Sequence, residues 1–419
     1  MKPARRAVVV VCDSLAADLV RPDTAPALSA LRAASADCVA TRSVFPSTTR
    51  TSSASMATGC LPSAHGLLGN TMVLQEDGAL VRMSVGKPDF LDRLRRATGR
   101  SLHRPTWAER LAGHGGAIVM SNVSPGAAYL HDPDNFGHVY HRSGSRGPGG
   151  VALDDGLAIE VGAAGDAAMT ERFCREVLRE RAPALAVLWL SEPDHTAHHQ
   201  ALGSPAHRAM IACADACVDQ VRRTVDTLQA GGDDMLLVAC SDHGMETVGR
   251  QIDLDALLVA GGWKSGPDSA DVVVAPNGTA ALLYFAGEAR ARIAALAQWL
   301  QAQDFTGAVF WGDALAELGL PTAGPLGIAL ALRRDETANA HGVPGTSVSV
   351  RSPFSSASAP GCGQHGGLGA SEQHPFLFLR GRRFAPGPRH QASSLIDIAP
   401  TVLHHLGVAT NSVQGRVLH

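Results

Sequence analysis

The sequence predicts an α/β fold in which helices cover both faces of a mostly parallel central sheet. Three apolar runs rich in valine and leucine, residues 7–12, 185–190 and 235–240, are each followed closely by acidic or histidine side chains. Continuous apolar runs of this length are typical of strands buried on both faces. Other stretches repeat apolar residues every three or four positions: 26–40, 169–182 and 207–230. That spacing indicates crossover helices between parallel strands.

The composition argues against nucleic acid and membranes as partners. In 419 residues, 36 Lys and Arg stand against 39 Asp and Glu, and a net charge of -3 leaves no basic stripe for a polyanion. The first apolar run stops at Asp13 without a small-residue cleavage site, which indicates a strand and not a secretory signal. No apolar run is long enough to cross a bilayer, so a cytoplasmic protein is expected. The pattern gives no prediction of the oligomeric state.

The eight cysteines contain no CxxC pair, which argues against a cysteine-rich zinc site or a disulfide framework. They are expected to be reduced. Residues 265–350 differ from the rest, because turn-rich pieces surround one expected helix at 287–303. We interpret 265–350 as an inserted cap that separates a first core part, 1–264, from a last core part, 351–419.

Three carboxylates stand where predicted strands end: Asp13, Asp194 and Asp242. Binding sites of open α/β sheets gather at the carboxyl ends of strands, so these side chains are expected to share one edge. His198 follows Asp194 at i+4, which places both on one face of a helical turn. Taken alone, such a pair is more often a polar surface turn. Oxygen and imidazole ligands together favour zinc, with manganese as the alternative.

Two further histidines complete the pattern. His243 follows Asp242 directly, and Gly244 allows a sharp bend after the strand. His365 lies in the glycine-rich stretch GQHGGLG. Because grouped buried carboxylates repel one another without cations, the sequence predicts a site for two divalent metal ions.

The segment 44–70 is dense in hydroxyl groups and becomes helix-compatible from residue 51 to 57. Serine and threonine at a helix start can simply cap free amides. The same geometry can also supply a nucleophile, since a nearby divalent ion lowers the hydroxyl pKa and the free amides can hold an anionic phosphate.

The ordered set Asp13, Thr49, EPDHTAH, Asp242-His243-Gly244 and His365-Gly366 resembles the alkaline phosphatase superfamily. More narrowly, it resembles the type I phosphodiesterase and nucleotide pyrophosphatase branch, with phosphonoacetate hydrolase as a close relative. The resemblance implies an alkaline-phosphatase-like three-layer α/β/α sandwich with a smaller inserted cap.

The resemblance also implies roles for individual residues. One metal would be held by Asp194, His198 and His365, and the other by Asp13, Asp242, His243 and Thr49. The nucleophilic threonine stands ten residues before a glycine in that branch, and counting back from Gly59 gives Thr49. Thr48 and Thr51 are its rivals. The implied reaction is hydrolysis of a phosphate ester through a phosphothreonine intermediate.

The substrate is expected to be a small soluble phosphate ester or a nucleotide-like molecule. Arg50 and Ser52, just after Thr49, are expected to bind its phosphate oxygens. A solvent-facing Arg50 is the alternative. Two other functions stay open: hydrolysis of a phosphonate carbon–phosphorus bond, and a catalytically silent metal-binding homologue.

Some polar residues near the motifs are expected outside the ligand set. His195 and His199 lie one position off the face that carries Asp194 and His198. The polar stretch 130–144 contains acidic and histidine side chains that could bind a third ion, but a loop that helps to shape the pocket is the preferred interpretation.

Overall fold

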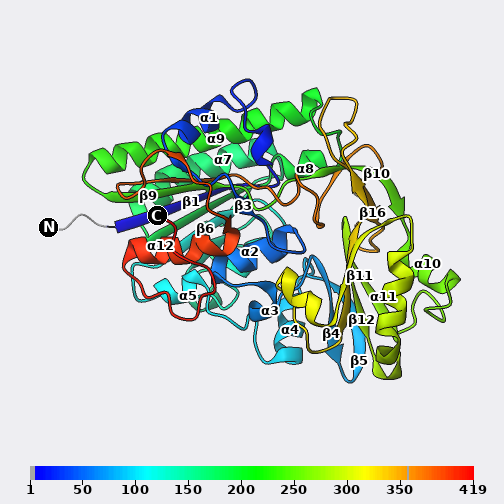
Figure 1. The fold of residues 1–419 in the computed structure, drawn as a ribbon. Helices are drawn as coiled ribbons and strands as arrows, with labels where there is room; N and C mark the ends of the chain where they lie inside the picture. The colour runs from blue at the N-terminus through cyan, green and yellow to red at the C-terminus, as the bar shows by residue number, and fades with distance from the viewer. Residues whose placement is uncertain (1–4, 356–357) are drawn as a thin grey trace.

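The computed structural model describes residues 5–355 and 358–419, and a mixed eight-stranded sheet forms its centre (Figure 1). β1, β6, β7, β8 and β9 pair in parallel, whereas β18 runs antiparallel to β9. The predicted α/β class with a mostly parallel sheet is therefore confirmed. The strand order is β19 (Gly387–Pro388), β2 (Ala36–Asp37), β18 (Leu377–Arg380), β9 (Asp234–Cys240), β1 (Arg5–Cys12), β8 (Leu185–Leu190), β6 (Ala117–Ser121) and β7 (His138–Tyr140).

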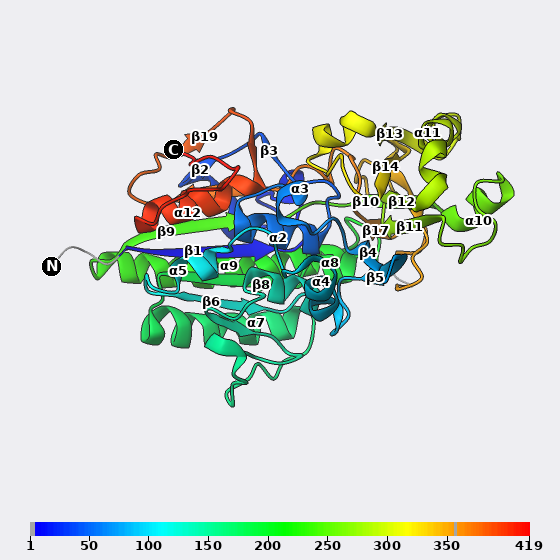
Figure 2. The same cartoon turned by 90° about the horizontal axis from the view of Figure 1, so that it is seen from below.

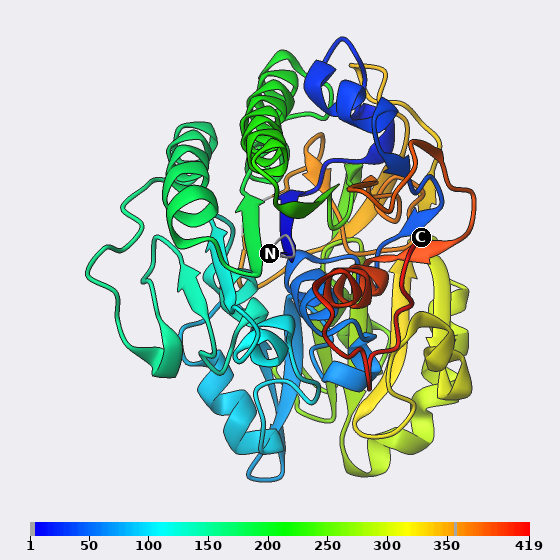
Figure 3. The same ribbon diagram turned by 90° about the vertical axis from the view of Figure 1, so that its left-hand side faces the viewer.

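Both faces of this sheet are buried, as the continuous apolar runs predict. Along β1, Val8 and Val10 pack into one core and Val9 and Val11 into the other. In Figure 3 the green helix α9 and the red helix α12 lie on opposite sides of the dark blue strand β1. The covering helices are α1 (Pro26–Ala33), α7 (Ala163–Arg172) and α9 (Pro205–Ala230) on the first face, and α2 (Thr49–Thr58), α5 (Trp107–Leu111) and α12 (Ile398–Leu406) on the second.

Helices form at the predicted places, but several of them begin or end at other residues than predicted. α9 starts two residues earlier than predicted, because Pro205 occupies its first turn and the Ser204 side chain accepts from the His207 amide. Helix α7 likewise starts early, at residue 163, and continues as the π-helical turns of η4 (Phe173–Arg181). The prediction of a helix over all of 26–40 is wrong. Its second half joins the sheet as β2, since β18 and β19 offer pairing partners on both sides.

Residues 265–350 contain more strand than the sequence indicates. β11 (Val272–Asn277), β12 (Ala280–Phe285), β14 (Leu326–Leu332) and β13 (Thr306–Trp311) form an antiparallel sheet. The expected helix is present as η5 (Gly287–Arg292) and α11 (Ile293–Gln301). The turn residues that dominate the sequence pattern lie largely between these strands, as Gly278 and Thr279 do in the β11–β12 hairpin.

The second sheet lies beyond the end of the central sheet (Figure 2). A hairpin from the first part of the chain, β4 (Thr71–Glu76) and β5 (Ala79–Ser84), packs against β11. A third sheet combines β10 (Glu246–Ile252) and β16 (Thr346–Val350) with two short strands, β15 (Arg334–Asp335) and β17 (Gly363–Gln364). The division of the chain after residues 264 and 350 stays a prediction.

Within the described ranges, no helix combines the length and the apolar character that a membrane span requires. The eight cysteines form no disulfide, and most of their side chains are buried.

A buried carboxylate ties the end of β8 to the helices above it. Asp166 of α7 accepts hydrogen bonds from the amides of Ser191 and Glu192 and from the side chain of Asn122. These residues follow β8 and β6 directly and lead into the segment that carries Asp194. Asp166 thus fixes the strand end from which the predicted ligand emerges.

We expect Asp166→Ala to lower the free energy of unfolding by about 2 to 4 kcal/mol, because buried amide donors lose their acceptor. Asp154→Ala is the matched control, since Asp154 is exposed and its loss should change stability by less than about 0.5 kcal/mol. Urea unfolding of both variants measures the difference. Equal stability of the two variants would contradict the role of Asp166.

Candidate metal centre

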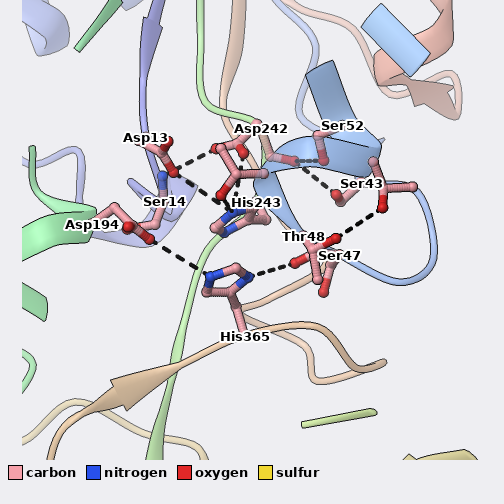
Figure 4. Close-up of polar contacts among 12 residues, drawn as sticks. Asp13, Ser14, Ser43, Ser47, Thr48, Ser52, Asp194, Asp242, His243 and His365 are labelled. Carbon is pink, nitrogen blue, oxygen red and sulfur yellow. Dashed lines mark hydrogen bonds and ion pairs between the residues drawn. The ribbon is translucent and has the colours of Figure 1, made fainter. Parts of the chain in front are cut away.

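Two groups of three side chains lie at the carboxyl edge of the central sheet. Figure 4 shows Asp13, Asp242 and His243 of one group and Asp194 and His365 of the other. In each group, one potential ligand atom per residue lies within 4.8 Å of the others. The structure thus brings together all six Asp and His residues that the sequence marks as ligands: Asp194, His198 and His365 in one group, and Asp13, Asp242 and His243 in the other.

The first group joins a turn after β8 to the glycine-rich loop. Asp194 opens the short helix α8 (Asp194–Ala197), so its side chain and that of His198 share one face. The two side chains approach at 3.4 Å, and His365 Nε2 lies 3.7 Å from Asp194 Oδ1. The turn of α8 and the loop that carries His365 therefore bring one carboxylate and two imidazole side chains to the same point.

The second group lies at the ends of β1 and β9 and is fully buried. His243 Nε2 lies 3.0 Å from Asp242 Oδ2 and 3.6 Å from Asp13 Oδ1. The rings of His243 and His365 stack with centroids 3.8 Å apart, which places the two groups side by side.

The three histidines share one arrangement of their ring nitrogens. Each Nδ1 is engaged away from the carboxylates: His198 with Ser358 Oγ at 2.7 Å, His243 with the Gly244 carbonyl at 3.1 Å, and His365 with the Ser47 carbonyl at 2.8 Å. A carbonyl partner requires Nδ1 of His243 and of His365 to carry a proton, and Nε2 of each ring then faces the carboxylates. Metal-binding histidines are oriented in this way.

The carboxylate oxygens at the centre have no hydrogen-bond donors. Asp13 Oδ1, Asp194 Oδ1 and Asp242 Oδ2 are buried, and each lacks a hydrogen-bond partner among the described residues. Burial, followed by the charges of Asp242 and Asp194, raises the pKa of Asp13 well above its usual range. Burial, with His243 and His198 nearby, lowers the pKa of His365 well below its usual range. Carboxylate oxygens without donors beside imidazole nitrogens are the surroundings that divalent cations fit.

Thr49 is the threonine that faces this centre. It opens α2, and its Oγ1 lies 3.2 Å from His243 Nε2. Thr48 is the N-cap residue, and its Oγ1 is hydrogen-bonded at 2.9 Å to Oγ1 of Thr51. The rival threonines therefore bond to each other, whereas the Thr49 hydroxyl points at the second ligand group. The predicted helix, 51–57, extends two residues further toward the site than the sequence indicates.

A cleft of about 330 Å³ opens over the two groups, bounded on the far side by the β11–β12 hairpin. Arg50 lines this cleft and is only partly exposed, with Nε 3.1 Å from Ser124 Oγ and Nη1 3.2 Å from the Asn70 carbonyl. The solvent-facing alternative for Arg50 is therefore excluded. Burial lowers the pKa of Arg50 to about 10, so the guanidinium is charged at neutral pH.

Ser52 occupies a different position from the one expected for a substrate contact. Its side chain is fully buried, and its hydroxyl points at the Asp242 carbonyl, 3.5 Å away. The lining of the cleft does not include it. Ser52 lies one turn into α2, against the residues that follow β9, so its hydroxyl faces the main chain of Asp242 and not the cleft.

Asn70 is a cleft residue that the sequence interpretation missed. Its Oδ1 accepts from the Arg50 amide at 3.1 Å, which fixes the side chain at the start of α2. No described residue accepts a hydrogen bond from its Nδ2. Asn70 closes the stretch 44–70 that the sequence marks, but nothing local distinguishes it from a turn residue.

Close backbone contacts explain two glycines of the site. A Cβ at Gly366, where φ is 130°, would lie 1.8 Å from the Asn277 carbonyl oxygen. A Cβ at Gly244 would lie 2.2 Å from the Ser371 carbonyl oxygen, whereas its φ is not positive. Gly244 is therefore required for close packing and not for the sharp bend that the sequence suggests.

The residues set aside in the sequence have separate places. His195 lines the cleft, whereas His199 is exposed. From the polar stretch 130–144, Asp132 accepts from the amides of Phe136 and Gly137 within its own turn, and Arg142 reaches the cleft.

The fold and these two ligand groups define the class of alkaline-phosphatase-like α/β proteins. The chain belongs to the type I phosphodiesterase / nucleotide pyrophosphatase family, which its sequence matches over residues 7–306. The resemblance in the motifs is thereby confirmed. No curated protein sequence matches the chain.

Solved structures from three sources share the fold. Murine ectonucleotide pyrophosphatase / phosphodiesterase 5, as an inactive threonine-to-alanine variant in complex with AMP, has a TM-score of 0.70 at 17% identity, covering 98% of this chain and 97% of that chain. The human protein of the same name has a TM-score of 0.67 at 14% identity, covering 98% of this chain and 97% of that chain. Phosphonoacetate hydrolase from Sinorhizobium meliloti 1021, in complex with phosphonoformate, has a TM-score of 0.66 at 18% identity, covering 97% of this chain and 96% of that chain. The predicted alkaline-phosphatase-like sandwich is confirmed.

Trp189 positions one of the candidate ligands. Its indole Nε1 donates to Asp13 Oδ2 at 2.9 Å, and both side chains are fully buried. We expect Trp189→Phe to weaken divalent metal binding about 10-fold to 100-fold, because the carboxylate loses the donor that orients it.

Trp107→Phe is the matched control. Trp107 is equally buried, but its indole nitrogen has no hydrogen-bond partner among the described residues. Its replacement should cost stability without changing metal affinity. Competition titrations with a zinc chelator compare the variants, and equal losses of affinity would show that packing alone is responsible.

Proposed function

We propose that this protein is a two-metal hydrolase of small phosphate esters and that Thr49 is its nucleophile. The observation that carries the proposal is the set of three buried carboxylate oxygens without hydrogen-bond donors, in two groups with histidine Nε2 atoms beside Thr49. The family is one of hydrolases of phosphate esters, which agrees with such a site.

The proposed metals are divalent, and zinc suits the ligands best. Asp194, His198 and His365 would hold one ion, and Asp13, Asp242 and His243, with Thr49, the other. Mixed nitrogen and oxygen ligands favour zinc, with manganese as the alternative. Such ions would neutralise the buried carboxylates, lower the pKa of the Thr49 hydroxyl and stabilise charge on phosphate oxygens.

The side chains of the cleft then divide the remaining work. Thr49 Oγ1 attacks phosphorus, the bond to the leaving oxygen breaks, and a phosphothreonine forms. Water then cleaves that ester and restores the hydroxyl. The Arg50 guanidinium lies next to Thr49 in the chain and faces the same cleft, so it can hold phosphate oxygens during both steps.

Asn70, in place of Ser52, contacts a phosphate oxygen of the substrate in this proposal. Its Oδ1 is held by the Arg50 amide, and it lines the cleft where the buried Ser52 does not. An amide fixed in this way can donate Nδ2 to a phosphate oxygen as charge develops there.

The inactive threonine-to-alanine variant among the similar structures supports a threonine nucleophile. We expect Thr49→Ala to lower kcat on the order of 1,000-fold or more while metal stays bound. Thr51→Ala should change kcat less than about 10-fold, because Thr51 bonds to Thr48 and does not line the cleft. Rates with bis-p-nitrophenyl phosphate and p-nitrophenyl thymidine monophosphate, with metal content by mass spectrometry, test both variants.

Hydrolysis of a phosphonate is the second candidate function. The similar structure of a phosphonoacetate hydrolase holds phosphonoformate, and a cleft lined by Arg50 and Arg142 suits a highly charged substrate. Phosphonoacetate therefore belongs in the same panel of substrates. If the metal-loaded wild type turns over none of them, the silent metal-binding homologue is the correct alternative.

Removing the metals should also destabilise the protein. We expect a chelator to abolish turnover and to lower Tm by several degrees, because Asp13 and Asp242 are then left buried near each other without a cation. An ion present at about 1,000 times its Kd adds about 4 kcal/mol to the free energy of unfolding. Added zinc should restore both quantities. The double variant Asp13→Asn, Asp242→Asn is the control: only the ion at Asp194, His198 and His365 can then be removed, so chelation should lower Tm less than in the wild type. An unchanged wild-type Tm would contradict structural coupling to the metals.

A further inference from the structure

Two arginines in the cleft wall have no direct ion-pair partner. Arg50 and Arg142 both line the cleft, and neither forms an ion pair with a carboxylate in the described parts of the chain, although Asp166 and Glu160 act on Arg142 from a longer distance. A partly buried guanidinium group without a direct partner gains most from a ligand that brings an oxyanion into contact with it. Arg50 is adjacent to Thr49 and is accounted for by the reacting phosphate. Arg142 is not.

Arg142 is held by one nitrogen only. Its Nη1 donates to the backbone carbonyl of Asn122, to Asn122 Oδ1 at 3.0 Å and to the Val123 carbonyl at 2.9 Å. No hydrogen bond from its Nε or Nη2 to a described residue is present. The guanidinium is thus anchored beyond the end of β6 while most of its N–H groups stay available to a ligand in the cleft.

The two arginines flank one short segment of the wall. Arg142 binds the carbonyl of Val123, and Arg50 Nε binds the hydroxyl of the next residue, Ser124, at 3.1 Å. Arg142 lines the same cleft as Asp194 and His195. Arg142 therefore occupies the cleft beside the reacting centre and at a place separate from Arg50.

Val161 and Phe354 are the exposed large apolar side chains among the described lining residues, so the wall offers a nucleobase few surfaces. Among the described lining residues, Phe354 supplies the one phenyl ring, and it is 40% exposed. Most other lining side chains are hydroxyls, amides, carboxylates and imidazoles. A base needs an apolar face to stack on, whereas a compact anion needs fixed donors.

We propose that Arg142 is a specificity-determining residue that receives a second oxyanion of the substrate, a carboxylate or a phosphate. This inference rests on the proposed function, in which the metals and Arg50 hold the reacting phosphorus group. The substrate class is then a compact phosphate ester or phosphonate with a second acidic group.

Binding to the zinc-loaded protein tests this directly. The ligands are 3-phosphonopropionate and its amide, 3-phosphonopropionamide, which have nearly the same size and differ in the second charge. Isothermal titration calorimetry should show the acid binding about 10-fold to 100-fold more tightly than the amide. Ethylene-1,2-bisphosphonate provides the second arm: tighter binding of this ligand than of the carboxylate points to a phosphate, and the reverse order points to a carboxylate.

Three variants separate Arg142 from a general field effect. Arg142→Gln should remove the preference for the acid, and Arg142→Lys, which keeps the charge, should keep part of it. Arg146→Gln is the matched control, since Arg146 is exposed, lies outside the cleft lining and should keep the full preference. A preference lost equally in Arg146→Gln would overturn the inference.

Turnover distinguishes failure of this inference from failure of the proposed function. The substrates are p-nitrophenyl 2-carboxyethyl phosphate and its carbamoyl analogue, from which release of p-nitrophenol is followed. Equal kcat/KM for the two, with equal affinity for the acid and amide ligands, would overturn the role of Arg142 while the hydrolase stands. No binding and no turnover of any phosphorus compound would overturn both. The wild-type comparison decides even if Arg142→Gln does not fold.

Discussion

The mutual repulsion of three buried carboxylates at one sheet edge is the constraint on which the rest of the site depends. Asp13, Asp194 and Asp242 each have a buried oxygen without a hydrogen-bond donor among the described residues. An arrangement of this kind is stable only if positive charge enters it. The histidine rings are oriented to bind a cation there, because Nδ1 of each ring is hydrogen-bonded elsewhere and Nε2 faces the carboxylates.

The fold holds this unfavourable arrangement together through rigid elements. Asp13 and Asp242 follow β1 and β9, neighbouring strands of the sheet, and the Trp189 indole fixes the first of them. Asp166 secures the strand end that precedes Asp194. The contacts of Trp189 and Asp166 thus hold the carboxylates in place although the carboxylates repel one another.

The cleft gains its chemical character from parts that are distant in sequence. Helix α2 supplies Thr49 and Arg50, the turn before β4 supplies Asn70, and the polar stretch 130–144 supplies Arg142. The β11–β12 hairpin closes the far side. The family relationship agrees with the two ligand groups, whereas a shared fold does not specify which molecule the cleft binds.

The sequence alone predicted three strands of the central sheet, several of its covering helices and all six candidate ligands, because these signals are local: apolar runs, helical spacing and acidic residues at strand ends. Thr49 could be predicted from spacing, but its two rivals were separated only by the direction of each hydroxyl. Tertiary structure alone decided that Ser52 faces inward while Asn70 and Arg142 face the cleft. Position in a cleft depends on chain segments far apart, so no local pattern encodes it.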